Sequence, residues 1–379
     1  AVCQVFEKVN TGGVPLNAFE LLTATFAADD FDLKHDWEMI KAEFKGYKLL
    51  ANVSNTDFIQ AITLLATYYK RKNKEQENVP EDELPAITCK RKDMLSLSLR
   101  DYKEYREPIV QGFIKASKIL LENHIFTARD LPYNTQLIPM AAILAVLGNR
   151  IDNIGYKKKL MQWYWCGVFG ELYGSANETR YALDLPQVVE WIENNGPEPK
   201  TVYDANFSPS RLHTLRTRNS AAYKGIYALL MDDNTKDWLS ATGINFSTYF
   251  SESIDIHHIF PVSWCEKNGI PKSDYNCIIN KTPLSARTNR IVSGDAPSKY
   301  LTKIKKHAGV SDEEFQNIMK SHVLNPEYLY EDDFTGFFND RKEQILQRIE
   351  RAMNKKIPRE EIHGEEGIFI GEEADEELE

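Results

Sequence analysis

One segment of the sequence, residues 254–301, constrains the fold most, because its periodicity changes twice within a short distance. Its start alternates apolar and polar residues, as a half-buried β-strand does, and Pro261 ends that pattern because proline has no N–H to donate to a sheet. Residues 262–278 predict a loop, and residues 278–284 predict a second strand that would close a hairpin. Ser285 can then cap a helix. The segment therefore predicts the order strand, loop, strand, helix of a ββα finger.

The rest of the chain is predicted to be mainly helical, because apolar residues recur in it at helical spacing. The predicted helices cover residues 17–26, 55–70, 101–123, 134–148, 156–173, 186–194, 209–231 and 334–354. The charged residues 71–93 predict an exposed loop, and the Asn-Asn-Gly-Pro run that begins at Asn194 marks the strongest domain boundary. The expected fold class is mainly α, α+β overall, with a helical N-terminal region followed by a helical domain that contains the ββα finger.

Charge is distributed unevenly along the chain. The formal net charge is −10, but the last sixteen residues, from Gly364, carry eight carboxylates and no basic side chain. Such a block is typical of a solvated, disordered tail, which we expect over residues 357–379. The remainder is then close to neutral, at about −2, and a nearly neutral chain neither excludes nor supports binding to nucleic acid.

Cysteine usage and hydropathy point to the cytoplasm. The five cysteines are scattered and form no Cys-x-x-Cys pair, which argues against a disulfide framework and against a zinc ribbon. No run of eighteen apolar residues occurs, and no charged region followed by an apolar one opens the chain, so we expect neither a membrane span nor a signal peptide. The abrupt start, Val2–Phe6 followed by an Asn-Thr-Gly-Gly turn, suggests a fragment whose N-terminal portion is missing.

Four side chains of the ββα segment carry the chemistry. His257 and His258 lie on the first predicted strand, Asn280 lies on the second, and Asn289 follows nine residues later in the predicted helix. Neutral imidazole is well suited to take a proton from water near neutral pH, and a second imidazole, a carboxylate or an amide oxygen can hold a divalent metal beside it. A His-His pair alone is more often structural than functional. The joint pattern with the two asparagines favours a phosphodiesterase site with one metal.

These motifs resemble those of the HNH nuclease superfamily. His-His-Ile-x-Pro, then Asn-Lys-x-x-Leu, then x-Asn-Arg matches its pattern, and asparagine in place of the last histidine is similar to the HNH domain of RNA-guided CRISPR effectors. The run His257–Leu301 further resembles the C-terminal nuclease domain of GmrSD-type, modification-dependent restriction enzymes. The opening Val-Phe-Glu-Lys-Val-Asn-Thr-Gly-Gly-Val-Pro-Leu is similar to the end of their N-terminal domain, and Trp163–Tyr173 to their connecting helical region. Their nucleotide-binding Gln-Arg motif does not occur, so no nucleotide site is evident in this fragment.

The resemblance implies a role for each site residue. His258 would be the general base, Asn280 would orient it, and His257 and Asn289 would hold one Mg²⁺ or Mn²⁺ ion, with Asp255 as a supplementary ligand. Basic side chains would bind the DNA phosphates. The candidates are Arg287, Arg290 and Lys299, and, in the helix predicted at residues 209–231, Arg211, Arg216 and Arg218.

The resemblance also implies a division of the chain into four parts. Residues 1–30 would be the remnant of an N-terminal sensor or nucleotide-binding domain, residues 31–200 a helical connecting domain, residues 201–356 the HNH nuclease domain, and residues 357–379 the acidic tail. We then expect a metal-dependent DNA endonuclease of a bacterial anti-phage or restriction system, acting on foreign or modified DNA. The expected partners are DNA, a second copy of the chain, and the missing N-terminal domain in cis or on another subunit.

Two other interpretations stay open. The chain could be a nucleic-acid-binding module whose nuclease site is weak or regulated, or a helical scaffold within a larger complex. Metal titration would discriminate the first from an endonuclease, because a pure binding module need not hold an ion through His257 and Asn289.

Overall fold

The described chain is almost entirely helical. The computed structural model describes residues 16–175, 177–232 and 234–359, and in these the predicted fold class, mainly α with a small β component, is confirmed. The earlier helices are α2 (Ala18–Ala27), α3 (Leu33–Phe44), α4 (Asn55–Gln76), α5 (Arg91–Met94), α6 (Leu99–Glu122), α7 (Leu137–Leu147), α8 (Ile154–Phe169), α9 (Asn177–Asn194) and α10 (Lys200–Asp204).

The second half of the chain contains shorter elements around two strands. In chain order these are α11 (Arg211–Thr214), α12 (Ala221–Leu230), α13 (Phe246–Ser251), β1 (Asp255–His258), α14 (Val262–Lys267), α15 (Lys272–Tyr275), the 3₁₀ turn η5 (Ile278–Asn280), β2 (Lys281–Leu284), α16 (Ala286–Val292), α17 (Pro297–Ala308), α18 (Asp312–Ser321), α19 (Pro326–Tyr330) and α20 (Phe334–Met353).

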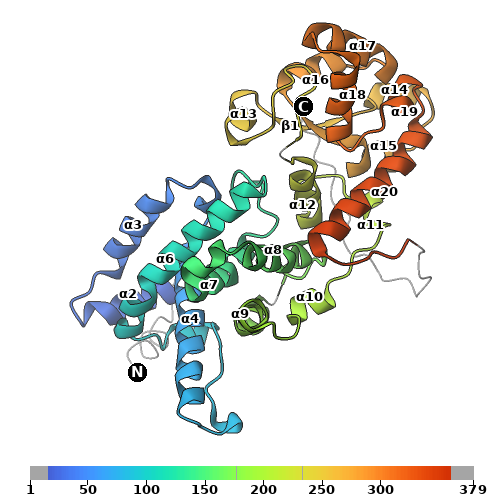
Figure 1. Ribbon diagram of the computed structural model, residues 1–379. Helices are drawn as coiled ribbons and strands as arrows, with labels where there is room; N and C mark the ends of the chain where they lie inside the picture. Colours follow the sequence, from blue (N-terminus) through green and yellow to red (C-terminus); the bar gives the residue numbers. More distant parts are fainter. Residues whose placement is uncertain (1–15, 176, 233, 360–379) are drawn as a thin grey trace.

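Figure 1 shows two groups of elements, which we name the helical lobe (α2–α9) and the site lobe (α11–α20). Helices α2–α7 gather at one end of the molecule and α16–α20 at the other, with α8 and α12 between them. Helix α20 packs on α8, and α12 packs on both α8 and β2. One continuous apolar core accordingly runs from Ala18 to Ile357, across the boundary predicted near residue 200.

Local sequence explains the helical lobe well. The Asn17 side chain accepts from the Glu20 amide at 2.9 Å while the Glu20 carboxylate accepts from the Asn17 amide at 2.7 Å, which is a capping box at the start of α2. Helix α7 is apolar on nearly every face and is buried between α4, α6 and α9. It approaches α6 so closely that a Cβ at Gly112 would collide with the Ala141 carbonyl.

Several predicted boundaries are wrong. Helix α4 continues to Gln76 into the stretch predicted as a loop, α9 begins at Asn177 with Pro186 inside it, and the 262–278 loop contains α14 and α15. The single helix predicted over 209–231 is instead α11 and α12, separated by residues 215–220. The reason is tertiary, because the carbonyls there are taken by the site: Leu215 O accepts from the Ile278 amide at 2.8 Å and Arg216 O from Lys281 Nζ at 2.6 Å.

The folded part of the chain includes residues that the sequence assigned to the acidic tail and to a separate N-terminal domain. Ile357 is buried, and the Arg359 guanidinium pairs with Glu343 and Glu350, so residues 357–359 belong to the folded lobe rather than to the tail. The predictions for residues 1–15 and for the acidic run from 360 onward lie outside the described residues. Helix α2, assigned from the sequence to a separate N-terminal remnant, packs into the core with α3 and α4.

Two further observations concern membrane-spanning helices and cysteines. Over the part of the chain that the structure describes, none of the helices combines the length and apolar character needed to span a bilayer. The four described cysteines are buried and free.

Candidate functional site

The two strands form an antiparallel pair that leads directly into α16. Asp255 lies opposite Leu284 and His258 lies opposite Lys281, and the sheet contains these two strands. The Ser285 hydroxyl accepts from the Thr288 amide at 3.1 Å and so caps α16, as predicted. The predicted order strand, loop, strand, helix is therefore present, although the loop contains two short helices.

His258 is held as a neutral imidazole. Its Nε2 lies 3.2 Å from the Asn276 amide oxygen, and with that oxygen as acceptor Nε2 carries the proton and Nδ1 keeps the lone pair. Burial and, to a lesser extent, the nearby Lys281 ammonium lower the pKa of His258 to about 4, although the hydrogen bond to Asn276 opposes the shift. The ring is therefore neutral, with one nitrogen free to take a proton, throughout the neutral pH range, as a general base must be.

His257 presents a buried nitrogen that the described structure does not satisfy. Its Nε2 is shielded from solvent and has no hydrogen-bond partner among the described residues. Burial lowers the pKa of His257, while the Asp255 carboxylate raises it. Asp255 lies two residues earlier, on the same strand face, and forms an ion pair with Arg218, whose guanidinium lies 5.0 Å from the Tyr227 ring centroid. A neutral imidazole with an unsatisfied nitrogen is a donor that a divalent metal such as Mn²⁺ can use.

The donor set for a metal is sparse. In the described ranges, no three His, Cys, Asp or Glu side chains are grouped as metal ligands would be. A metal at His257 would therefore need Asn289, water or substrate oxygens to complete its shell. Asn289 lies half-buried on α16, four residues after the cap Ser285.

Asn280 acts on the backbone after His258 rather than on the ring. It is fully buried, and its side chain accepts from the Phe260 amide at 2.8 Å and donates to the carbonyls of Phe260 and Tyr275 at 2.9 Å. Its own carbonyl accepts from the Ile259 amide at 2.8 Å. Asn280 thus fixes the chain immediately after β1, and the residue that bonds the ring of the predicted base is Asn276, which the sequence pattern did not single out.

The six predicted phosphate-binding side chains fall into two groups. Arg287 and Arg290 on α16 and Lys299 on α17 are exposed, and their side chains appear in none of the ion pairs found among the described residues. Arg216 is also exposed. The other two are engaged within the protein: Arg211 pairs with Glu171 through Nε at 3.1 Å and Nη2 at 2.9 Å, and Arg218 pairs with Asp255.

The sequence did not predict two buried polar side chains, His322 and Arg341, that hydrogen-bond to β2. His322, which has no partner at ligand spacing in the sequence, is fully buried and bridges the Thr282 hydroxyl at 2.8 Å and the Lys236 carbonyl at 2.6 Å. Because a carbonyl only accepts, the proton is on Nε2. Arg341 donates to the Lys281 carbonyl at 2.9 Å from α20. These partners are separated by 40 to 86 residues, so no local spacing could have revealed them.

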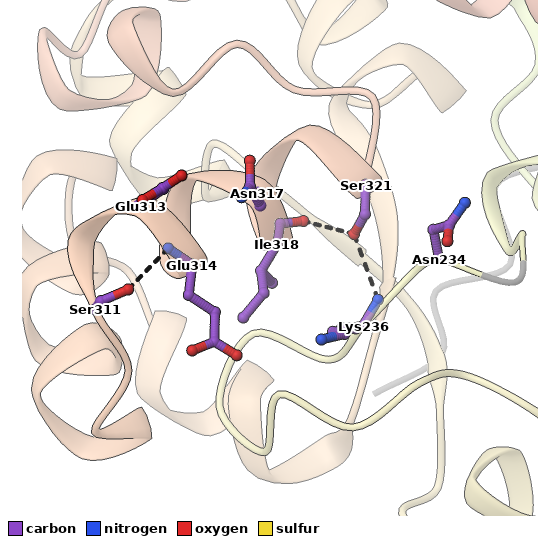
Figure 2. A pocket seen from close by; sticks show the side chains of 8 residues that line it. All are labelled: Asn234, Lys236, Ser311, Glu313, Glu314, Asn317, Ile318 and Ser321. Carbon is purple, nitrogen blue, oxygen red and sulfur yellow. Dashed lines mark hydrogen bonds between the residues drawn. The ribbon is translucent and has the colours of Figure 1, made fainter.

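The site does not coincide with a pocket near α18. Figure 2 shows this pocket, of about 550 Å³, between the segment that contains Asn234 and Lys236 and the helix α18, which lines it with its cap Ser311 and with Glu313 and Glu314. None of its lining residues is a predicted site residue. The predicted catalytic and metal-binding residues instead lie on β1, in the 3₁₀ turn η5, which holds Asn280 directly before β2, and on α16.

Comparison with known proteins gives one distant relative and no named activity. No family model matches the chain. It is 24% identical over 384 aligned positions to the uncharacterized protein MJ0686 of Methanocaldococcus jannaschii, an alignment that covers 92% of this chain and 61% of that protein. The chain thus spans about three-fifths of the length of the curated relative it matches, and the likeness extends over both lobes.

Proposed function

We propose that the chain is a metal-dependent DNA endonuclease of the HNH type, with His258 as the general base. The observation that carries this proposal is the pairing of two unlike histidines on β1. One is neutral and held by Asn276, and the other, His257, has a buried nitrogen that no described residue satisfies. The strand pair and the capped α16 that follow it support the same conclusion.

Each side chain of the site has a separate role in this proposal. Nδ1 of His258 takes a proton from the attacking water, and the hydrogen bond from Nε2 to Asn276 keeps the ring in the required tautomer. His257 and Asn289 would hold the metal, which when bound neutralises charge on the scissile phosphate. Arg287, Arg290 and Lys299 would bind the neighbouring phosphates through their exposed cationic groups.

The direct test is plasmid cleavage in Mg²⁺ or Mn²⁺. His258→Ala should lower the rate by roughly 10²–10⁴-fold, the usual contribution of a general base. His307→Gln is the matched control, because His307 lies exposed on α17 and bonds a carbonyl of its own helix, and it should cleave at the unaltered rate. Equal cleavage by the unaltered chain and His258→Ala would remove His258 from the mechanism.

The substrate class within this proposal is foreign or modified DNA, which rests on the resemblance of His257–Leu301 to GmrSD-type enzymes. Parallel cleavage of plain, methylated and glucosylated plasmids would test it. Preference for one modified substrate supports the restriction role, whereas equal cleavage of all three assigns a nuclease without modification dependence.

A nucleic-acid-binding module is the second candidate, and the ion pair between Arg218 and Asp255 favours it, because this contact occupies the carboxylate that could have supplemented the metal ligands. Calorimetric titration with Mn²⁺ separates the two candidates. For an endonuclease, His257→Ala and Asn289→Ala should each weaken Mn²⁺ binding, whereas a binding module should show DNA affinity that is independent of Mn²⁺.

A further inference from the structure

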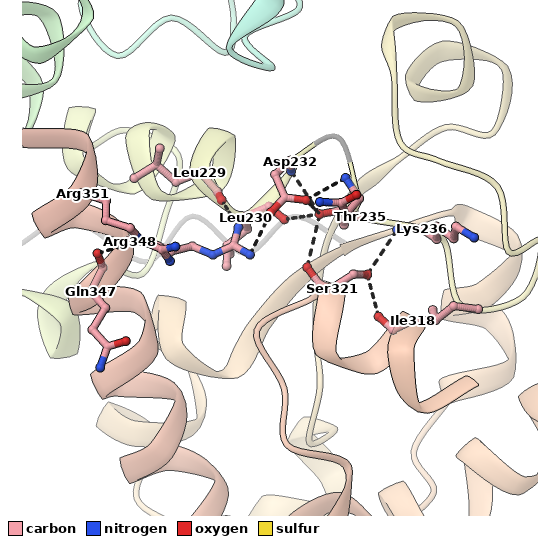
Figure 3. Close-up of polar contacts among 11 residues, drawn as sticks. Leu229, Leu230, Asp232, Thr235, Lys236, Ile318, Ser321, Gln347, Arg348 and Arg351 are labelled. Atoms are coloured by element: carbon pink, nitrogen blue, oxygen red, sulfur yellow. Dashed lines mark hydrogen bonds and ion pairs between the residues drawn. The ribbon is translucent and has the colours of Figure 1, made fainter. Parts of the chain in front are cut away.

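A segment of the site lobe, residues 234–244, connects α12 to α13 and lies against the strand pair; we name it the bracing segment. Figure 3 shows how its start is tied to two later helices. The Thr235 hydroxyl contacts the Ser321 carbonyl at 3.3 Å, and the Lys236 amide donates to the Ser321 hydroxyl at 3.4 Å. Just before the segment, Arg348 of α20 pairs with Asp232 at 3.0 Å. The segment is therefore fastened to α18 directly, and to α20 through Asp232, which hydrogen-bonds Thr235.

The centre of the bracing segment is Asp237, a carboxylate with 1% of its surface exposed. Its Oδ2 accepts from the Ser285 amide at 2.8 Å. Its Oδ1 accepts from the Thr288 hydroxyl at 2.7 Å and from the amides of Leu239 and Ser240, both at 3.1 Å. One buried anion thus has four close donors, two of them from α16 and its cap.

Asp237, although about fifty residues away in the sequence, completes the cap of α16. In a capping box the residue at the third helical position bonds the amide of the cap residue. Here that position is Thr288, whose hydroxyl is directed to Asp237, and the amide of the cap Ser285 is taken by Asp237 instead. The carboxylate also lies at the positive end of the helix, where negative charge is favoured.

The same segment also holds β2. His322 bonds the Lys236 carbonyl on one side of its ring and the Thr282 hydroxyl on the other. The strand and the helix that follows it are therefore fixed to one segment through neighbouring residues, Lys236 and Asp237. Asn289 comes directly after Thr288, so its position relative to β1 depends on this connection.

We propose that Asp237 is a positioning residue of the site, which sets α16 and therefore Asn289 against the strand pair. The proposal rests on the proposed metal-dependent function for its consequence in metal binding, but its structural part concerns α16 alone. Asp237 does not touch the reacting atoms. Its effect should appear as metal affinity and helix order rather than as a loss of the base.

Asp237→Asn is the sharpest variant, because it removes one acceptor without changing the shape of the side chain. An amide has one oxygen, so it cannot accept from Ser285 and from the three donors on Oδ1 at once. Thr288→Val is the second variant, since it removes one donor to the same carboxylate, together with the acceptor of the Ser285 hydroxyl, and leaves the Ser285 amide bonded to Asp237. Ser240→Ala is the matched control: its hydroxyl reaches Asp237 at 3.4 Å but has no contact with α16.

Two measurements are made on the full chain. Hydrogen exchange reports on the amides of residues 286–292, and Mn²⁺ titration gives a dissociation constant beside the cleavage rate at saturating Mn²⁺. Asp237→Asn should speed exchange of these amides by at least about tenfold and weaken Mn²⁺ by about tenfold, the lower end of the range for groups that orient metal ligands. High Mn²⁺ should restore much of the cleavage. Thr288→Val should shift both quantities in the same direction by less, and Ser240→Ala should shift neither.

The outcomes separate this proposal from the proposed function. Unchanged exchange in a folded Asp237→Asn variant overturns the positioning role, whatever the chain does with DNA. Faster exchange with an unchanged Mn²⁺ constant also overturns it, because α16 would then be loosened without consequence for the ligand. If the unaltered chain neither binds Mn²⁺ nor cleaves, the metal-dependent function fails, and the exchange of residues 286–292 still decides whether Asp237 holds α16.

Discussion

Two buried aspartates, one in each lobe, differ in the direction of their pKa shift although neither is open to solvent. Asp184 in α9 accepts from the hydroxyls of Tyr173 and Thr201; burial raises its pKa to about 6, and the Thr201 hydrogen bond only partly offsets this. For Asp237 in the site lobe, burial likewise opposes ionisation, but hydrogen bonds from the Ser285 amide, the Thr288 hydroxyl and two further amides leave the pKa below its ordinary value. Three backbone amides and a hydroxyl stabilise a carboxylate more than two hydroxyls do.

The same difference extends to the lobes as a whole. The helical lobe consists of long helices whose apolar faces cover one another, such as α7 between α4, α6 and α9. The site lobe has two strands of four residues and many short helices, so side chains such as Asn280, His322 and Arg341 satisfy the backbone groups that regular structure leaves over. We expect apolar exchanges to be tolerated in the first lobe, and loss of a polar side chain to be costly in the second.

The largest effect on stability is expected for Asn280→Ala. It leaves the Phe260 amide and the carbonyls of Phe260 and Tyr275 without their partner, and should lower the free energy of unfolding by about 5 kcal/mol in urea denaturation. Asn276→Ala, which removes one bond to the His258 ring, should cost about 1 kcal/mol. A loss under about 2 kcal/mol for Asn280→Ala would mean that the polar contacts are replaceable and that the contrast between the lobes is wrong.

A cavity in the helical lobe should be nearly as costly but should leave the site intact. Ile143→Ala removes a fully buried side chain of α7 and should lower the free energy of unfolding by about 4 kcal/mol, with the Mn²⁺ dissociation constant unchanged. Ile304→Ala in α17, which packs on α16, should cost a similar amount and weaken Mn²⁺ as well. If Ile143→Ala weakened Mn²⁺ equally, the two lobes would be coupled more tightly than we expect.

Lowering the pH should change the stability contributions of two buried groups, His322 in the site lobe and Asp184 in the helical lobe, in opposite directions. The pKa of His322 falls from 6.5 to about 4 on folding because of burial, so the unfolded chain binds more protons between these values, and stability decreases by about 3 kcal/mol as the pH falls through them. Asp184 behaves in reverse: its pKa rises from 3.8 to about 6, so the folded chain binds more protons there, and stability increases by about 3 kcal/mol over pH 6 to 4.

Unfolding free energies at pH 7 and pH 4 test this balance. His322→Gln, whose amide can still donate to the Lys236 carbonyl, should make the chain relatively more stable at pH 4. Asp184→Asn should make acid more damaging, because it removes the compensating gain. Parallel pH curves for both variants and the unaltered chain would show that neither group retains its shifted pKa in solution.

The smallest effect on stability is expected at the exposed cations of α16. Arg287→Ala with Arg290→Ala should change the unfolding free energy by less than about 0.5 kcal/mol. The same double variant should reduce the slope of log DNA affinity against log salt by about 0.9 for each phosphate that the protein no longer neutralises. Lys34→Ala with Lys45→Ala, which removes the same charge from exposed positions at the two ends of α3, should leave that slope unchanged if DNA lies on the site lobe.

Much of the fold followed from local patterns. Asn17 and Ser285 cap their helices as predicted, the helix predicted over 134–148 forms as the buried α7, and both strands form at the segment predicted for them. The error over 209–231 has a different origin, because the propensity there is helical. The chain bends at residues 215–220 where Ile278 and Lys281 take two of its carbonyls, and these partners come from more than sixty residues away.

The sequence by itself determined the mainly helical class, the strand pair that leads into a capped helix, and the candidates His257, His258, Asn280 and Asn289, because each depends on spacing within one segment. Only the tertiary structure decided which groups hold them: Asn276 on the base, Arg218 on Asp255, and Asp237 on the cap of α16. Burial decided the protonation of His258, and hydrogen bonds decided that of Asp237, since desolvation and the number of donors around a group depend on neighbours that no local pattern specifies.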